Sequence, residues 1–88
     1  MSRFEVLVEV ALRPGIADPE GATIARALPA LGFEGVSEVR VGKAVRLAVE
    51  APDPEAAGAL ARRLSDRLLA NPVIEQATVT VGGAEQVP

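Results

Sequence analysis

Three pairs in which Asp or Asn precedes Pro divide this 88-residue chain into its helices and strands. Asp18-Pro19 and Asp53-Pro54 each place a capping carboxylate directly before a proline, and proline is favoured at the first position of a helix. Asn71-Pro72 follows a leucine-rich stretch and precedes a β-branched pair. Asn tolerates the left-handed conformation that ends a helix, and Pro cannot continue one. The sequence therefore predicts two helix starts and one helix-to-strand joint with almost no loop.

The first strand is expected at residues 3–12, where apolar and polar side chains alternate with a period of two. Phe4 and every second residue up to Leu12 point to the buried face. The opposite face is charged except at Leu7 and Ala11. These two are either ordinary exposed apolar residues or a contact with another subunit, and the strand favours neither interpretation.

The first helix is expected to follow the turn at residues 13–15 and to begin at Pro19. Ile24, Leu28 and Leu31 share one stripe and should be buried. Pro29 falls within this helix, where it removes a backbone hydrogen bond, so we expect a kink or a tightened last turn there.

A β-hairpin is expected next, around Gly42-Lys43. A two-residue loop at that point would turn Arg46 into the core. A loop that also includes Ala44 pairs Val41 with Val45 and keeps every charge outside. We therefore expect a loop of odd length, or a bulge, at residues 42–44.

The second helix is expected to begin after Asp53 and to end near Asn71, which should adopt the left-handed conformation. The last strand should run from about Ile74 to Val81. The predicted buried stripe of the helix consists of Ala57, Leu60, Ala61, Leu64 and Leu68.

The expected order of elements is strand, helix, strand, strand, helix, strand. This order predicts an α+β fold, a two-layer, ferredoxin-like β-α-β-β-α-β domain with a mainly antiparallel sheet and two helices on one face. We expect residues 1–82 to form a single domain and residues 83–88 to form a flexible C-terminal tail. A domain of this size buries only about 60–65% of its unfolded surface, so self-association would add stability.

Composition excludes several classes of function. The net charge of −3 disfavours a nucleic-acid binder that relies on a basic surface. The sequence contains neither Cys nor His, which removes thiol nucleophiles, the usual zinc ligands and the commonest general base. No apolar run approaches the roughly 20 residues of a membrane span, and the N-terminus lacks the core of a signal peptide. We expect a cytoplasmic protein.

Known functions of the same strand order also fit poorly. An RNA-binding domain needs stacking aromatic residues on its sheet, and the only aromatic residues are Phe4 and Phe33. The sequence has no convincing counterpart to the phosphate loop of acylphosphatase, and Gly42-Lys43 lacks the spacing of a P-loop. Asp18 and Asp53 are best interpreted as helix caps, and Lys43 as a solvated residue at a loop tip.

Three blocks in register carry a family resemblance. They are residues 12–21 (LRPGIADPEG), residues 39–43 (VRVGK) and residues 68–75 (LLANPVIE). Their order and separation resemble the PurS family, the small subunits of phosphoribosylformylglycinamidine (FGAM) synthase in purine biosynthesis. The resemblance covers Val6 to about Val81. Pro29 departs from the helix former expected at its position.

The resemblance implies a non-catalytic subunit of an ATP-dependent glutamine amidotransferase, a carbon–nitrogen ligase. In this family the large synthetase subunit binds ATP, magnesium and formylglycinamide ribonucleotide (FGAR), and a glutaminase subunit releases ammonia from glutamine. The small subunit acts as a dimer that bridges the two and supports ammonia transfer. No cofactor is expected in this chain itself, and both a homodimer and a tetramer remain open.

Seven residues of the three blocks are hypothesised to contact partner subunits, because motif residues on loops are poorly explained by core packing. The alternative function is a ferredoxin-like regulatory module that binds a small molecule. A stand-alone enzyme is disfavoured by the missing His and Cys. The hypothesised contact residues are Arg13, Asp18, Arg40, Gly42, Lys43, Asn71 and Pro72.

Overall fold

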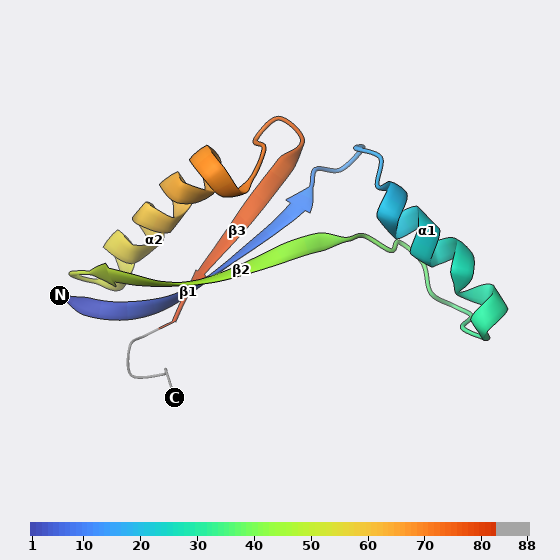
Figure 1. Ribbon diagram of the computed structural model, residues 1–88, viewed down its shortest axis with the longest axis horizontal. Coiled ribbons are helices and arrows are strands. Elements are labelled where there is room, and N and C mark those ends of the chain that lie inside the picture. The colour runs from blue at the N-terminus through green and yellow to red at the C-terminus, as the bar shows by residue number, and fades with distance from the viewer. Residues whose placement is uncertain (83–88) are drawn as a thin grey trace.

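The computed structural model describes residues 1–82 of the chain, and the expected tail at residues 83–88 lies outside this range. Three strands form an antiparallel sheet of order β2-β1-β3, so that β1 is central (Figure 1). The elements in chain order are β1 (Ser2–Leu12), α1 (Pro19–Ala27), a 3₁₀ helix (Pro29–Leu31), β2 (Gly42–Ala51), α2 (Pro54–Leu64), a π-helical turn (Ser65–Leu69) and β3 (Glu75–Val81).

The core lies between the sheet and α2. The alternation predicted for the first strand is confirmed, because every second residue of β1 from Phe4 to Val10 is buried and Val8 is 0% exposed. A central strand has neighbours on both edges, so its inward side chains are covered from both sides and by the helix above. The remaining buried apolar residues of the core are Val49, Ala51, Ala57 and Ala61.

Both predicted helix caps are confirmed. The Asp18 carboxylate accepts a hydrogen bond from the backbone N–H of Gly21 at 2.9 Å, and the Asp53 carboxylate accepts one from Ala56 at 2.7 Å. A proline follows each aspartate at the start of its helix. These bonds satisfy backbone donors that a helix leaves unpaired at its N-terminus.

The buried stripe of α2 differs from the prediction. Leu60 and Leu68 are 38% and 74% exposed, whereas Ser65 is fully buried and donates its hydroxyl to the carbonyl of Ala61 at 2.7 Å. The small side chains at every fourth position let the helix lie close to the sheet. The π-helical turn then shifts the helical phase by one residue, so that Leu69 packs against the core in place of Leu68.

The predicted hairpin is wrong. β2 is continuous from Gly42 and pairs with β1 along its whole length, with Val8 opposite Val45. The preceding residues 36–41 form no strand. Glu38 has a φ of 55°, which interrupts an extended backbone, and the N–H of Val41 is hydrogen-bonded to Asp18 rather than to a strand. The sheet consequently has three strands, and its α+β class and antiparallel ferredoxin-like arrangement are as expected.

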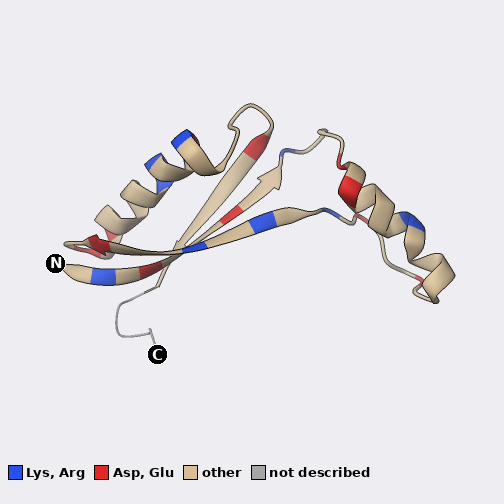
Figure 2. Ribbon diagram, viewed as in Figure 1, with Lys and Arg blue, Asp and Glu red and all other residues tan. Residues whose placement is uncertain are grey.

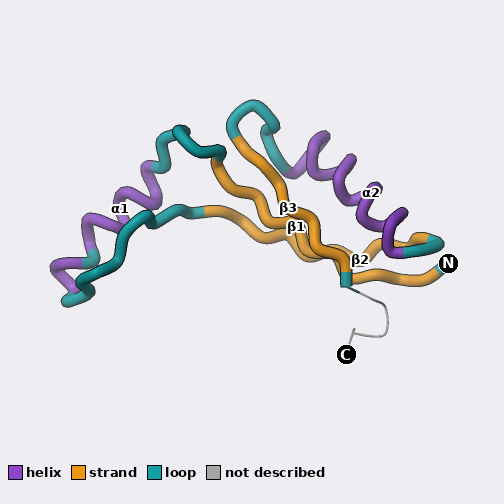
Figure 3. The backbone as a smooth tube through the Cα atoms, turned by 180° about the vertical axis from the view of Figure 1, so that it is seen from behind, coloured by secondary structure: helices purple, strands orange, loops and turns teal. Residues whose placement is uncertain are grey.

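Among residues 1–82, only α2 covers the sheet, so the prediction that both helices lie on one face is wrong for α1. α1 projects beyond the end of the sheet in both views of the backbone (Figures 1 and 3). Ile24 is 44% exposed and Leu31 is 68% exposed, because no strand lies beneath them. The tightened last turn expected at Pro29 is confirmed as the 3₁₀ helix. We call residues 19–38 the arm, and residues 13–18 and 39–43 the neck that joins it to the sheet.

Charges of both signs are interspersed over the strands, and basic residues gather on the last turns of α2 (Figure 2). On the sheet face without a helix, Ala11 is exposed and Leu7 is partly exposed. This face is therefore a mixed surface with small apolar areas. Among residues 1–82, no helix has the length and apolar character needed to cross a membrane.

Candidate partner interface

The three motif blocks meet at one end of the sheet. β1 ends at Leu12, opposite Glu75 at the start of β3, and β2 begins at Gly42 beside Ala11. This antiparallel pairing brings the neck and the loop at residues 70–74 to the same end. Residues separated by up to 59 positions in the sequence are therefore in direct contact, as between Arg13 and Pro72.

Asp18 is at the centre of the neck. Its side chain is only 6% exposed, and its second carboxylate oxygen accepts a hydrogen bond from the N–H of Val41 at 2.8 Å. The hydrogen bonds from Gly21 and Val41 lower the pKa of this carboxyl group below its ordinary value of 3.8. Partial desolvation opposes this shift, and the positive charge of Arg40 adds to it. Asp18 is consequently a charged acceptor within the chain as well as a helix cap.

Arg40 and Arg13 tie the neck to neighbouring backbone. Arg40 Nε lies 4.0 Å from Asp18 Oδ2, and Arg40 Nη2 donates to the carbonyl of Ile16 at 3.3 Å, with a longer 3.5 Å contact to the carbonyl of Arg13. Arg13 Nε donates to the carbonyl of Pro72 at 3.0 Å. Both guanidinium groups remain exposed to solvent, so they can also face a partner.

Gly42 and Lys43 have different roles. A Cβ atom at position 42 would lie 2.6 Å from the carbonyl oxygen of Val10, so glycine permits the close approach of β2 to β1. Lys43 is exposed, and no ion pair to it is present among residues 1–82. Lys43 therefore has an ammonium group that can contact a partner, whereas Gly42 is required for the packing of β2 against β1.

The joint at Asn71 differs from the prediction. The left-handed conformation is absent there, since Glu38 is the only non-glycine residue with positive φ within residues 1–82. Asn71 instead accepts the N–H of Val73 with its side chain at 3.1 Å and donates its own N–H to the Glu75 carboxylate at 2.7 Å. These hydrogen bonds stabilise a five-residue loop, so Pro72 is presented on a turn and not at a direct helix-to-strand joint.

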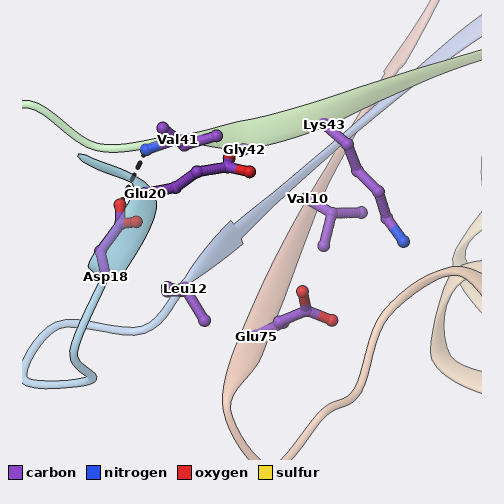
Figure 4. A pocket seen from close by; sticks show the side chains of 8 residues that line it. All are labelled: Val10, Leu12, Asp18, Glu20, Val41, Gly42, Lys43 and Glu75. Atoms are coloured by element: carbon purple, nitrogen blue, oxygen red, sulfur yellow. Dashed lines mark hydrogen bonds between the residues drawn. The ribbon is translucent and has the colours of Figure 1, made fainter. Parts of the chain in front are cut away.

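A shallow pocket of about 280 Å³ opens between the neck and the start of β3 (Figure 4). Val10, Leu12 and Val41 supply apolar surface, and charged side chains surround it. Sequence reasoning missed Glu20 and Glu75 as lining residues, although both belong to the motif blocks. Glu75 could have been identified as a lining residue from its pairing with Leu12, had the register of the last strand on the first been predicted. The charged lining residues are Asp18, Glu20, Lys43 and Glu75.

The pocket offers apolar contact, three carboxylates and one ammonium group. Among the described residues, no group of three or more His, Cys, Asp or Glu is arranged to hold a metal ion. The chemistry present at this end of the sheet is that of recognition by hydrogen bonds and charge. Fold and surface together define an open-faced α+β domain of ferredoxin-like layout, with one helix held off its sheet.

Comparison with known proteins gives the family. The family model described as PurS, phosphoribosylformylglycinamidine (FGAM) synthase, matches residues 5–83, and the chain belongs to this family. The chain is 46% identical over 72 residues to the FGAM synthase subunit PurS of Synechocystis sp., which covers 82% of this chain and 72% of that protein. It is 42% identical over 74 residues to the PurS subunit of Mycobacterium leprae, covering 84% and 90% of the two chains.

Solved structures agree with this assignment. A chain of PurLQS from Thermotoga maritima superposes with a TM-score of 0.85 at 34% identity, covering 93% of this chain and 100% of that chain. PurS from Methanocaldococcus jannaschii, one of the subunits of formylglycinamide ribonucleotide amidotransferase, gives a TM-score of 0.82 at 34% identity. That match covers 91% of this chain and 96% of the other.

Proposed function

We propose that this chain is the small, non-catalytic subunit of a FGAM synthase complex in purine biosynthesis. The complex converts FGAR to FGAM with ATP and glutamine. In this proposal the large synthetase subunit holds ATP and magnesium, the glutaminase subunit supplies ammonia, and all three act in the cytoplasm. The observation that carries the proposal is the family match over residues 5–83, together with the likeness to a chain of the PurLQS structure.

The mechanism proposed for this chain is structural. It bridges the large and glutaminase subunits and holds their active sites in alignment, so that ammonia passes between them without loss to water. An open shape supports this role. The Cα radius of gyration is 16.6 Å, whereas a compact chain of this length has a radius of about 12 Å. An extended molecule can contact two partners at separate places.

Self-association as a homodimer or tetramer is part of the same proposal. The chain exposes 6226 Å², whereas a folded protein of its 9.1 kDa mass exposes about 4,900 Å². The excess is larger than the roughly 800 Å² that each partner contributes to a standard interface. Exposed apolar side chains of the arm contribute to this excess, namely Ile24, Leu31, Phe33 and Val36.

The proposed contact surface for the other subunits is the end of the sheet at the neck. It includes the seven residues hypothesised from the sequence, which lie together there. Lys43 and Pro72 are exposed and suited to direct contact. Asp18 and Gly42 support the surface from within the chain. Arg13, Arg40 and Asn71 combine intramolecular hydrogen bonds with an exposed position.

Complex formation tests this proposal. The purified chain is mixed with the large and glutaminase subunits of the same source, and the mass of the assembly is measured by light scattering after gel filtration. The measurement is made with and without Mg-nucleotide and glutamine. We expect one species that contains all three subunits. Three separate species under every condition, with each subunit folded, would contradict the proposal.

A charge reversal localises the contact. Lys43→Glu should weaken binding to the partner subunits by at least about tenfold, because like charges across an interface are costly. Arg63→Glu is the matched control, since it reverses an exposed basic residue on α2, away from the neck. Equal affinities for the two variants and the unmodified chain would remove Lys43 from the interface.

A second candidate function is a regulatory module that binds a small molecule, and the pocket at the neck favours it. Its volume of about 280 Å³ is near the lower limit for ligand pockets. Calorimetry of the isolated chain with amino acids and nucleotides separates the two candidates. The module predicts a bound ligand, whereas the bridging subunit predicts none for the chain alone.

A further inference from the structure

One carboxylate of the neck accepts hydrogen bonds from two separate parts of the chain. Asp18 Oδ1 accepts the N–H of Gly21 at 2.9 Å, and Asp18 Oδ2 accepts the N–H of Val41 at 2.8 Å. The first bond caps α1. The second bond joins the start of α1 to the residue directly before β2, across 23 positions of the sequence. The Asp18 side chain therefore caps the start of α1 and also binds the residue that precedes β2.

Close packing accompanies this bridge. A Cβ atom at position 21 would lie 2.5 Å from the carbonyl oxygen of Val39 and 2.7 Å from Asp18 Oδ2. Gly21 is accordingly the one buried residue of α1. The helix start and the chain segment that enters β2 are in contact at this point and leave no room for a side chain.

Little else fixes the direction of the arm. α1 makes its substantial contacts with the 3₁₀ helix that follows it and not with the strands, and its apolar residue Ile24 is 44% exposed. α2, in contrast, packs against all three strands. The angle at which the arm leaves the sheet thus depends on hydrogen bonds in the neck, where Arg40 adds two contacts to the carbonyls of Arg13 and Ile16.

We propose that Asp18 is a positioning residue that latches the arm to the sheet, with one carboxylate oxygen capping α1 and the other holding Val41. This inference concerns the chain alone and goes beyond the proposed bridging function. The latch requires two acceptor oxygens on one short side chain. Asn and Ser retain a single acceptor oxygen that can cap the helix. One oxygen cannot occupy the positions of both Oδ1 and Oδ2, so an oxygen that caps α1 at Gly21 leaves the N–H of Val41 without its acceptor.

The test uses Asp18→Asn and Asp18→Ser, with Asp53→Asn as the matched control. Asp53 also precedes a proline at a helix start and caps the helix through Ala56, but it makes no bond to a distant segment. Amide hydrogen exchange is measured by NMR on each full chain. Val41 should exchange about ten- to a hundredfold faster in both Asp18 variants, as expected for the loss of a charge-assisted hydrogen bond. Gly21 and the amides of the sheet should keep their protection.

Arm direction gives a second readout. Because the sequence has no Cys, spin labels can be attached to two introduced cysteines, Ala30→Cys at the end of the arm and Ala59→Cys on the exposed side of α2. Labelled chains are diluted with unlabelled chains, so that only distances within one chain are measured. The parent and the Asp53→Asn variant should give one narrow distance distribution, and Asp18→Asn a broad one.

Two results would overturn the latch. Unchanged protection of Val41 in Asp18→Asn and Asp18→Ser, with an unchanged distance distribution, would show that the arm is held by other contacts. Loss of protection throughout α1 in both variants, with the sheet intact, would show that Asp18 is only a helix cap. Either result can be obtained without the partner subunits, so the proposed function is tested separately.

Discussion

Glycine at position 42 is required by close packing, and Gly42→Ala tests this requirement. A Cβ atom there would meet the carbonyl oxygen of Val10 at 2.6 Å and its carbonyl carbon at 3.6 Å. Both atoms belong to the backbone of the central strand, and Val10 itself is 2% exposed. The strand cannot yield as a flexible side chain would. Alanine therefore forces β1 and β2 apart at the end of the sheet.

The expected magnitude follows from two opposing effects. Overpacking against a fixed core costs about 1–3 kcal/mol, and replacing glycine by alanine regains about 0.5–1 kcal/mol of backbone entropy. The free energy of unfolding should therefore fall by about 0.5–2 kcal/mol. Such a change is a measurable fraction of the roughly 5–15 kcal/mol that typically separates a folded domain from its unfolded state.

Gly58→Ala is the matched control. Gly58 lies within α2, where an added Cβ would meet only Val81 Cγ2 at 3.4 Å. The same chemical change should there raise the free energy of unfolding by about 0.5–1 kcal/mol through helix propensity. Urea denaturation followed by circular dichroism measures both variants. All samples are compared at one protein concentration, because self-association raises apparent stability.

The opposite signs of the two changes are the decisive result. Gly42→Ala that is as stable as, or more stable than, the parent would refute the packing argument at the neck. In that case packing within the chain would not explain the glycine at position 42, and contact with a partner subunit would be the remaining explanation to test. A loss of stability in both variants would instead refute the inference that position 58 has room for a methyl group beside Val81.

Three further predictions follow from the core and the neck. Val8→Ala removes two methyl groups at a fully buried site and should lower the free energy of unfolding by about 2–3 kcal/mol in urea denaturation; a loss under about 0.5 kcal/mol would contradict the central position of Val8. Arg13→Met removes the hydrogen bond to Pro72, so amide exchange at Val73 should accelerate while the exchange of central β1 amides is unchanged. The pKa of Asp18 is lower in the folded chain than its ordinary value of 3.8. The ionised carboxylate therefore stabilises the fold above pH 3.8, and this stabilisation is lost as the pH falls through the lower pKa of the folded state. The amide resonance of Val41 should therefore shift on acidification below about pH 4, and Asp18→Asn should abolish the shift. The charged groups that face Asp18 across the neck and pocket in this titration are Arg40, Glu20, Lys43 and Glu75.

Local signals predicted the elements that depend on local chemistry. The alternation in β1 and the caps at Asp18 and Asp53 are confirmed, because the period of a strand and the first turn of a helix involve neighbours in sequence. The tightened turn at Pro29 belongs to the same group. Such features need no knowledge of the partner surface.

Features that depend on distant contacts were not predictable. The hairpin failed because Val45 pairs with Val8 of β1 and not with Val41, and a parity argument cannot identify the partner strand. Ser65 was not expected in the core, since its burial depends on the hydroxyl bond to Ala61 and on the π-helical turn. The hydrogen bond from Val41 to Asp18 joins residues 23 positions apart, so the spacing of apolar and polar residues nearby does not indicate it.

The contact residues could be predicted as a group but not by role. The motif blocks indicated the seven positions, and the antiparallel register brings these positions to one end of the sheet. Sequence alone gave no reason to separate the packing role of Gly42 from the free charge of Lys43. That separation requires the distance from position 42 to the Val10 carbonyl.

The bridging function is tested most directly by glutamine-dependent amidine formation. The large and glutaminase subunits from the same source are assayed with and without this chain, using glutamine or ammonia as the nitrogen donor. We predict that the glutamine-dependent rate requires the chain and that the ammonia-dependent rate does not. An unchanged glutamine-dependent rate without the chain, with the other two subunits folded, would contradict the bridging function.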